Sequence, residues 1–594
     1  SNQNQGSFTV NSNNLALELN KFLTDPKIQL DLAKGQITWA KTKGNWVVNV
    51  KDLALSNPEI TTNLDLSYVL GAPGQPDLMS LDMDFPTAKL ATAYRYLPVD
   101  MDRDTHHYLS KAFSAGTIQK GKLHIKGDPQ KIPFPKSSDG EFSLNLPITG
   151  VTYSPVPTLP TNQGIWSAFT NVNGVIAMQN SAFTVDISQG SFKQVALSQF
   201  HAEIPNVSAK QLELAVNGKA QGEATQMLEY VFASPAGKNQ SSLEKNLRAT
   251  GNTNLDVGLK IPLSGNADTK VDLKLDLPGN RVQWSDMPPL ENLKGKIRIT
   301  ETNPEFDHVS AHFLGGNLKI TTAPSTAGSQ NYTVSGDISA SFIKNYYVNT
   351  LKKDPHAALE ALSGNAKYDG VMSFGKSGSE TNLKFDLRDL ASTAPAPAQK
   401  PKGIPLLGLI NIKTQAKPKT GSTSVIWNGK FGDLYTTQGE LNSESELRYG
   451  LGVGAPANLP QQGFSLNLVS NELNADSWID FLVQPNKKNV PIKADEPNTS
   501  QIQMTVQAKK FILMDRPWQD MNITASQKSD ALQVRISSPQ ANGQIQYVGA
   551  NQASPNGSLT GTFSRLRVPD VPSEAAQVSS TSGSKKMSGP DSIP

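Results

Sequence analysis

The strongest constraint on the fold is an alternation of apolar and polar side chains along the chain. It reads LDLSY over residues 64–68, LNLPI over 144–148, VDLKLDL over 271–277 and LKFDLR over 383–388. Successive side chains of a β-strand point to opposite faces, so each run predicts a strand with one apolar and one wet face. Parallel strands buried on both faces instead form continuous apolar runs. The chain is therefore predicted to be mostly β, with antiparallel pairing.

A few segments predict short helices between the strands. Residues 100–113, 224–232 and 476–482 carry helical spacing or end signals, with Asp476 as the expected N-cap of the third helix. Residues 341–362 predict two helices that are split at a proline. Helices of this length are expected to serve as connections beside a β-sheet and not as a core of their own.

Two segments predict linkers because of their composition. Residues 391–403 read ASTAPAPAQKPKG, and the tail from Pro572 onward is rich in Ser and Gly. Pro-rich and Ser/Gly-rich stretches have few apolar side chains to bury, so they are typical of linkers and disordered tails.

The balanced charge and the lack of cysteine exclude several function classes. The 594 residues include 55 Lys and Arg against 52 Asp and Glu, a formal net charge of +3. A nucleic-acid partner is not expected, because it would call for a basic surplus or stripe. Without cysteine the chain has no disulfides, thiolate metal sites or cysteine nucleophiles. The longest apolar run, residues 404–410, is far shorter than the ~20 residues of a membrane helix.

One short motif suggests a nucleotide site, but its surroundings argue against that reading. Residues 370–377 read GVMSFGKS, which fits the G-x-x-x-x-G-K-[ST] pattern of phosphate-binding loops. Such a loop needs a helix after it, because the helix N-terminus and the loop amides hold the phosphates. Here an alternating run over 382–388 follows, and residues 366–374 also read as a strand. We therefore expect a β-hairpin and no nucleotide.

Catalytic and metal-binding patterns are not found in the sequence. The seven histidines form no H-x-x-x-H or H-E-x-x-H motif, and there is no G-x-S-x-G elbow. Carboxylates are spread along the polar strand faces, and the sequence singles out no pair for acid–base chemistry. The chain is predicted not to be an enzyme, with no catalytic residues, no metal site and no cofactor.

A long series of one-sided strands has to hide its apolar face. Two sheets can cover each other in a sandwich, or a sheet can close into a barrel. A single curved sheet can instead keep its apolar face open for a greasy ligand, since large open apolar surface marks a binding site. The alternation alone favours closed cores and leaves the open sheet as the alternative.

A series of short segments, in a fixed order over nearly the whole chain, carries a resemblance to a known family. The segments are YRYLP (94–98), AGTIQKGKLHIKG (115–127), PFP (133–135), LEYVFASP (228–235), LKIPL (259–263), PLENLKG (289–295), FLGG (313–316), PAPAQK (395–400), NADSW (474–478) and GTFSRLRVP (561–569). Together they resemble the AsmA-like superfamily, specifically the YhdP-type large periplasmic proteins of Gram-negative bacteria.

The resemblance implies an elongated, twisted antiparallel sheet that is curved into an apolar groove, with a few short helices. It implies a first groove segment over residues 1–340, a helical insertion over 341–365, a second groove segment over 366–571 and a flexible tail over 572–594. The family typically has an N-terminal membrane helix and a further AsmA-like region after the segment that contains Arg567-Val568-Pro569. Because this sequence has neither, the resemblance implies an internal part of a longer protein.

For function, the resemblance implies a bridge that conducts phospholipids between the inner and outer membranes and supports the outer-membrane barrier. The expected partners are phospholipid acyl chains, and both membranes through segments absent from this chain. The expected location is the periplasm, with an anchor in the inner membrane. The alternative is a structural or adhesive β-protein with closed cores and no lipid. The candidate groove-lining residues are Leu64, Leu66, Leu144, Leu146, Leu273, Leu275, Leu383, Phe385, Leu466 and Leu468.

Overall fold

The computed structural model describes most of the chain between residues 4 and 571. The described part leaves out residues 24, 158–166, 234–240, 265–266, 286, 302–303, 327, 351–356, 376–377, 417–422, 443–445, 484–500, 529–530 and 550–556, and also the two ends, 1–3 and 572–594. The predicted tail and Pro355 therefore lie outside the described residues. The chain divides into two compact units, Ser1–Phe313 and Leu314–Pro594.

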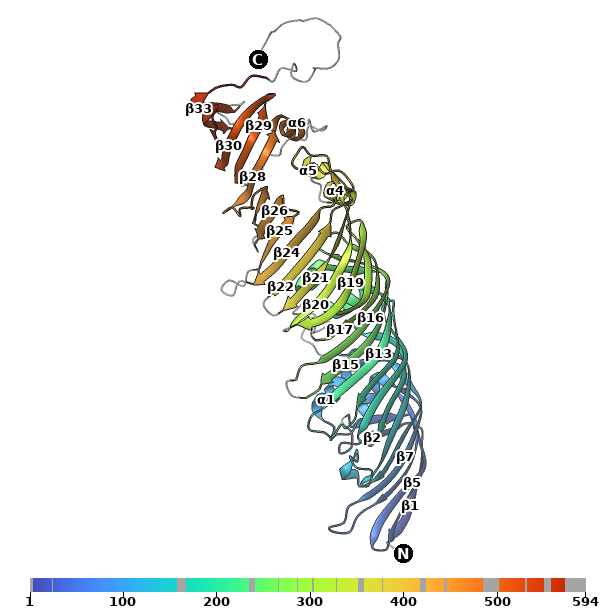
Figure 1. The fold of residues 1–594 in the computed structure, drawn as a ribbon. Helices are drawn as coiled ribbons and strands as arrows, with labels where there is room; N and C mark the ends of the chain where they lie inside the picture. Colours follow the sequence, from blue (N-terminus) through green and yellow to red (C-terminus); the bar gives the residue numbers. More distant parts are fainter. Residues whose placement is uncertain are drawn as a thin grey trace. The chain divides into compact units, whose positions relative to one another are not determined.

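The fold is mostly β, and 31 strands belong to one long, twisted sheet, as the alternation predicts. A second sheet consists of β2 and β3 alone. Most strands that follow each other in the chain pair with each other, so in each unit they lie side by side nearly in chain order (Figure 1). The exceptions include β1 with β4, β13 with β15 and β22 with β24. The sheet does not close on itself.

The first unit contains strands β1 to β18 and the helices between them. Its elements are β1 (Gln5–Ser12), β2 (Leu15–Glu18), β3 (Lys27–Leu30), β4 (Leu32–Thr42), β5 (Asn45–Ser56), β6 (Ile60–Val69), β7 (Leu78–Lys89), the 3-10 helix η1 (Leu90–Tyr96), α1 (Arg103–Ala112), β8 (Phe113–Gly127), η2 (Pro129–Lys131), β9 (Gly140–Tyr153), β10 (Phe169–Gln179), β11 (Ala182–Phe192), β12 (Val195–Ile204), β13 (Glu213–Glu223), α2 (Ala224–Ala233), α3 (Ser241–Asn246), β14 (Leu247–Thr250), β15 (Asn252–Pro262), β16 (Lys270–Trp284), β17 (Leu290–Ile299) and β18 (Glu305–Phe313).

The described part of the second unit contains strands β19 to β33 and the helices α4 to α6. Its elements are β19 (Gly316–Thr326), β20 (Ser329–Ser339), α4 (Ala340–Asn349), α5 (Ala357–Glu360), β21 (Leu362–Gly375), β22 (Gly378–Asp386), β23 (Leu390–Ser392), β24 (Leu407–Ala416), β25 (Thr423–Phe431), β26 (Tyr435–Leu441), β27 (Leu447–Val453), β28 (Gly463–Asn474), α6 (Ala475–Val483), β29 (Ile502–Leu513), β30 (Arg516–Lys528), β31 (Ala531–Ser537), β32 (Ala541–Val548) and β33 (Ser558–Leu566).

Nearly all of the pairings are antiparallel, and the exceptions make the sheet mixed. β27 pairs with β28 in parallel, and β28 pairs with β29 in parallel. A parallel pair needs a connection that returns across the sheet. After β27 this connection is hydrogen-bonded to the neighbouring strands. The side chain of Asn467 on β28 donates to Pro456 O at 2.9 Å, and that of Gln438 on β26 donates to Ala457 O at 2.6 Å.

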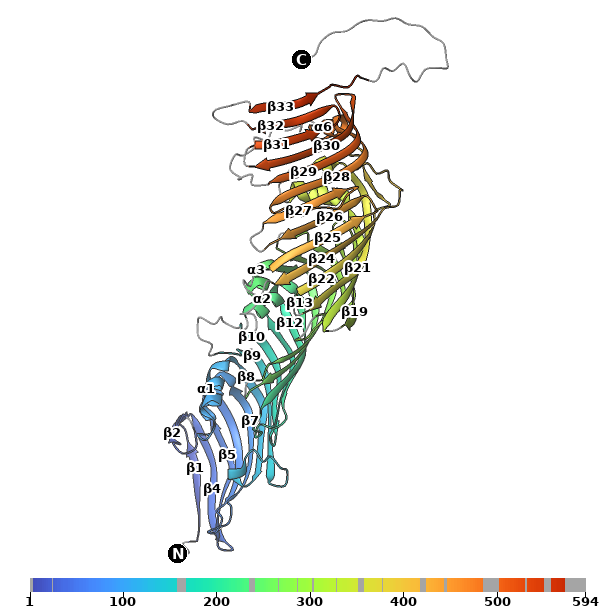
Figure 2. The same cartoon turned by 60° about the vertical axis from the view of Figure 1, so that its left-hand side comes forward.

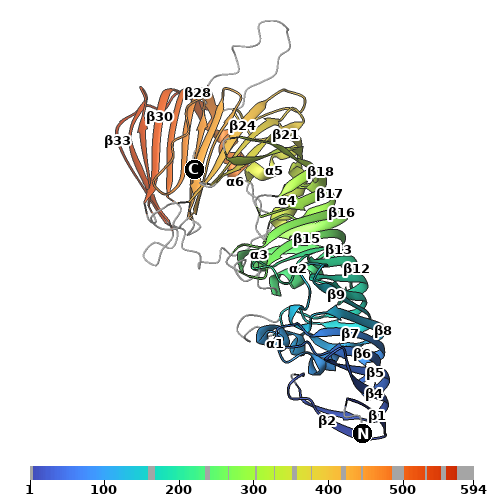
Figure 3. The same cartoon turned by 90° about the horizontal axis from the view of Figure 1, so that it is seen from below.

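The α-helical connections of each unit lie at the same end of its strands, whereas the 3-10 helix η2 follows β8 at the other end. In an antiparallel series every second connection falls at the same end, and the helices follow β7, β13, β20 and β28, whose final residues share that end within their unit. Figure 2 shows α1, α2 and α3 at one end of the strands of the first unit, and Figure 3 shows them on one side of its sheet.

Three of the predicted helices form close to their expected bounds, as α1, α2 and α6, and the fourth segment forms α4 and α5. Asp102 caps α1, since its carboxylate accepts from Thr105 N at 2.9 Å. The prediction that Asp476 caps α6 is wrong. Asn474 accepts from Ser477 N at 3.0 Å instead. The carboxylate of Asp476 accepts from two amides of the turn between β29 and β30, at 2.8 and 2.9 Å.

The prediction that residues 391–403 form a linker is wrong, because this segment is packed and hydrogen-bonded. The Trp478 indole donates to Ala396 O at 2.8 Å, and the Tyr435 hydroxyl donates to Pro397 O at 2.5 Å. The ammonium of Lys400 donates to Leu390 O at 2.7 Å, and Ala394 is buried. The partners of the segment come from β26 and α6, far along the chain, and therefore local composition does not reveal them.

The GVMSFGKS motif lies in a β-hairpin, as expected. β21 and β22 pair from Lys367↔Asp386 to Gly375↔Gly378, and a strand follows the motif where a nucleotide loop needs a helix. Residues 376 and 377 lie outside the described residues.

Candidate functional site

The candidate site is the apolar face of the long sheet, which is traced here through directly paired residues. Side chains of directly paired residues lie on the same face of a sheet. In the first unit one row of pairs crosses eight strands from β5 to β12. It consists of Leu53, Leu64, Met83, Leu123, Leu144, Met178, Phe183 and Ile204.

Two further rows extend this face across the remaining strands of the unit. One contains Leu146, Ile176, Val185, Ala202, Val216, Leu259 and Val271. The other contains Leu197, Ala220, Leu255, Leu275, Ile297 and Phe306. Leu144 and Leu146 stand two apart on β9, and Val271 and Leu275 stand four apart on β16, so the three rows share one face.

The second unit has two such rows, each of which crosses nearly all of its strands. The first contains Val334, Gly370, Leu383, Ile410, Gly429, Thr437, Leu451, Leu466, Met504, Ala525, Val534 and Ile545. The second contains Tyr368, Phe385, Gly408, Phe431, Tyr435, Val453, Leu468, Val506, Ile523 and Ile536. The parallel strands keep these rows in register, and the apolar face continues across them.

The structure thus places the six predicted lining residues of the first unit on one face, and the four of the second unit on one face. Nine of the ten are half-buried. The exception is Leu468, which is 6% exposed and belongs to a packed core that includes Phe511 and Trp518. Half-burial fits side chains that have neighbours within the sheet but no layer packed on top of them.

Little in the structure covers this face. Among the described residues, the second sheet is the β2–β3 pair, and the helices are short. Several closed clusters include residues of the helices or of η1, whereas the cluster of Leu277, Leu293 and Val309 lies on β16 to β18 alone. Leu90 of η1 packs with Ile118, Ile148 and Val151, and Met227 of α2 packs against Phe192 and Val195. The face is therefore covered in part by the helices and η1, and around Val453, Leu468 and Val506 it belongs to a packed cluster, whereas most of the other row residues stay half-buried.

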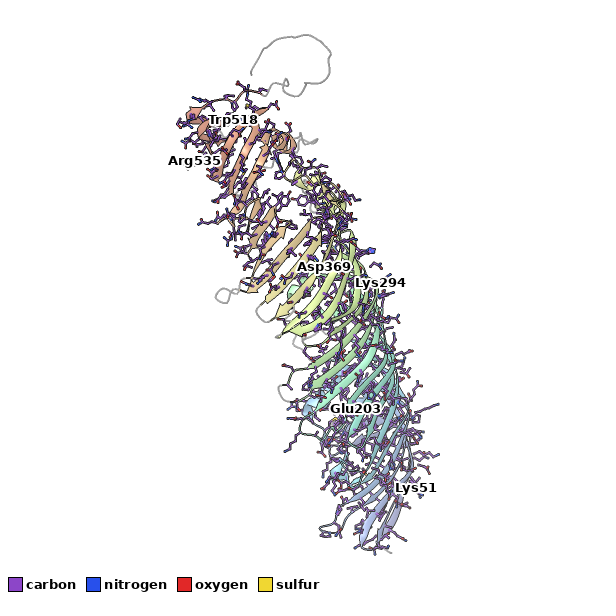
Figure 4. The ribbon with its side chains drawn as sticks, viewed as in Figure 1. Lys51, Glu203, Lys294, Asp369, Trp518 and Arg535 are labelled. Atoms are coloured by element: carbon purple, nitrogen blue, oxygen red, sulfur yellow. The ribbon has the colours of Figure 1, made fainter. Side chains whose placement is uncertain are left out.

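The opposite face is polar and carries paired charges. Arg298 donates to both carboxylate oxygens of Asp272, at 2.8 and 3.1 Å, and this lowers the pKa of Asp272. His201 lies 2.7 Å from Asp186, whose hydrogen bond raises the pKa of the imidazole. Figure 4 labels further charged residues from this face, among them Glu203 and Asp369. Exposed pairs of this kind contribute little stability, and they keep this face wet.

The described residues hold no group of three or more His, Cys, Asp or Glu that could bind a metal ion. No helix in the described part of the chain is long and apolar enough to cross a membrane.

Sequence reasoning missed the residues that join the predicted ones into rows. Met83 and Leu123 link Leu64 to Leu144, and Met178 continues that row beyond Leu144. Ile410 and Met504 belong to the row of Leu383 and Leu466. Period-2 spacing marks the apolar side of each strand, but it does not fix which residues lie opposite each other, because that depends on register, bulges and turn lengths.

In each unit an open, twisted sheet has one apolar face and one polar face, which is the architecture expected of an AsmA-like protein. The comparison with family models agrees, since the model of the YhdP protein family matches residues 1–594. The chain belongs to the YhdP family.

A curated relative gives this membership a functional context. The chain is 22% identical over 528 residues to the intermembrane phospholipid transporter YhdP of Escherichia coli (strain K12), and the match covers 87% of this chain. It covers 39% of the relative, so the chain spans about two-fifths of that protein's length. The predicted resemblance is confirmed at the level of the family.

Proposed function

We propose that this chain is a segment of a phospholipid conduit, in which acyl chains lie on the apolar face while headgroups stay in water. The observation that carries the proposal is the continuity of the apolar rows, which cross eight strands in the first unit and twelve in the second without a charged side chain. The family relationship to a phospholipid transporter supports it.

The geometry suits acyl chains better than a compact ligand. Apolar surface contributes roughly 25 cal/mol per Å² when it is removed from water, wherever along the face the contact is made. A chain that moves from one row to the next exchanges similar contacts, so no deep minimum holds it in place. A catalytic cluster would not help this task, and we propose a role without catalysis.

The finer points of the proposal concern the whole protein. We place the segment in the periplasm, in a bridge between inner and outer membranes that is anchored in the inner membrane and supports the outer-membrane barrier. Nine of the ten predicted lining residues form the floor of the groove, and the tenth, Leu468, is packed beside it in the core with Phe511 and Trp518. Residues 1–340 and 366–571 form two groove segments on either side of a helical insertion over 341–365.

Lipid extraction tests this proposal. The chain is expressed in a bacterial periplasm and purified, and the extracted lipid is quantified by mass spectrometry against a periplasmic β-protein with a closed core. We expect phospholipid to co-purify with this chain and not with the control. Absence of phospholipid from both would contradict the conduit and favour a structural or adhesive β-protein.

A further inference from the structure

The apolar face carries a recurrent pairing of an aromatic ring with a glycine on the neighbouring strand. The structure has Gly6 directly opposite Trp39, Gly408 opposite Phe431, Gly439 opposite Trp427 and Gly543 opposite Phe563. A fifth pair, Gly218 and Phe200, lies beside a bulge between β12 and β13. Both units contain such pairs.

In each pair the ring lies across the glycine. A Cβ placed on Gly439 would stand less than 3.0 Å from three ring atoms of Trp427, and one placed on Gly218 would stand equally close to Phe200. Real Cβ atoms do not come so close to other atoms, so the ring occupies the space of the missing side chain. Gly439 and Gly408 are buried as a result, although among the described residues no second sheet covers them.

A glycine in a strand needs such an explanation. Its flexibility weakens a strand by roughly 0.5–1 kcal/mol relative to alanine, and it often marks a close approach by another group. All five glycines have ordinary backbone angles here, since none is among the positive-φ residues. Positive-φ conformation therefore does not require glycine at these positions. The space taken by the ring does, and at Gly543 the backbone oxygen of Thr562 takes part of that space as well.

We propose that these glycines hold the aromatic rings flat on the sheet and thereby set the clearance for acyl chains above it. The inference rests on the proposed function and names the residues that fix the depth of the groove floor. A flat ring adds about 3.5–4 Å, one carbon contact distance, to the height of the floor. A ring pushed upright by a neighbouring Cβ would stand in the path of the chains.

The test uses Gly439→Ala in the second unit and Gly218→Ala in the first. Each variant, purified from a bacterial periplasm, is analysed for phospholipid per chain by mass spectrometry. We expect a several-fold loss in each. The rescue variants Gly439→Ala/Trp427→Leu and Gly218→Ala/Phe200→Leu remove the ring and should recover the wild-type amount. Gly549→Ala is the control, because a Cβ there meets nothing within 4 Å.

The outcomes separate this inference from the proposed function. A wild-type chain without phospholipid would overturn both. A loaded wild-type chain with equally loaded alanine variants would overturn the inference and leave the conduit in place. Rescue variants that stay empty would also overturn it, because the loss would then come from backbone distortion and not from a raised ring. Thermal unfolding of each variant shows whether it is folded. If the variants of one unit misfold, the alanine and rescue variants of the other unit decide the test.

Discussion

Replacing Leu275 with aspartate tests whether the apolar face is open. Leu275 is half-buried on β16 and pairs with Leu255 on one side and Ile297 on the other. Leu293→Asp is the matched control, because Leu293 is 5% exposed within a closed cluster on the neighbouring strand. Leu275 packs at the edge of the same cluster and is only partly buried, so the two substitutions put the same carboxylate in the same sheet and differ in how deeply the site is buried.

The two sites predict different losses of stability. Half of a leucine's burial is worth about 1–1.5 kcal/mol, and the poorer strand propensity of aspartate adds up to ~1 kcal/mol, so Leu275→Asp should cost about 2 kcal/mol. The carboxylate at position 275 can stay hydrated on an open face. At position 293 it would replace a packed side chain and be buried without a partner, which should cost more than ~4 kcal/mol.

Phospholipid binding should be affected more by Leu275→Asp than by Leu293→Asp, the reverse of their order in stability. A carboxylate in the path of an acyl chain costs roughly 2.5–3.5 kcal/mol, the cost of aspartate in a hydrocarbon environment. Since 1.4 kcal/mol is about tenfold, occupancy of that position should fall by about two orders of magnitude. The assays are urea unfolding, hydrogen exchange of β15 to β17, and phospholipid crosslinking from a photoreactive residue at position 255.

The reasoning fails if the two variants behave alike. A folded Leu275→Asp variant that still crosslinks phospholipid at the wild-type level would show that acyl chains do not pass this row. A Leu275→Asp variant that loses as much stability as Leu293→Asp would show that the site is closed core.

Three other predictions concern parts of the structure outside the floor. Gly450→Ala should cost roughly 2–3 kcal/mol in urea unfolding, because a Cβ there would collide with the backbone of the crossover after β27, whereas Gly549→Ala should be nearly neutral. The hydrogen bond from Tyr68 to Asp77 raises the pKa of the phenol to about 12. This hydrogen bond should contribute its full stabilisation of the fold below pH 10 and lose it as the pH rises toward 12. The difference in phenolate absorbance between the wild type and Tyr68→Phe follows the titration. Asp476→Ala leaves two turn amides without their acceptor and should cost about 1–2 kcal/mol, seen as faster hydrogen exchange at the β29–β30 turn.

Much of the fold could be predicted because it depends on local pattern. The alternation over 271–277 specifies which side of β16 is apolar, and the strand after Gly378 excludes a phosphate loop at the motif. The position of the helices at one end of the strands follows from the order of the connections. These features need only the chain's own neighbours in sequence.

The rest depends on contacts between distant segments. Residues 391–403 read as a linker because Tyr435 and Trp478, which bind their carbonyls, lie far along the chain. The parallel pairing of β27, β28 and β29 leaves no local mark, since their alternation looks like that of antiparallel strands. The glycine–aromatic pairs such as Gly439 and Trp427 appear only once the register is known.

The central claim is that phospholipid contacts one face of the sheet, and crosslinking from both faces measures this directly. A photoreactive residue is placed at Leu275 or Phe385 on the apolar face, or at the adjacent Lys274 or Lys384 on the polar face, and crosslinked lipid is identified by mass spectrometry after irradiation in living bacteria. The account predicts phospholipid adducts at 275 and 385 and none at 274 and 384. Adducts at all four positions, or at none, would contradict it.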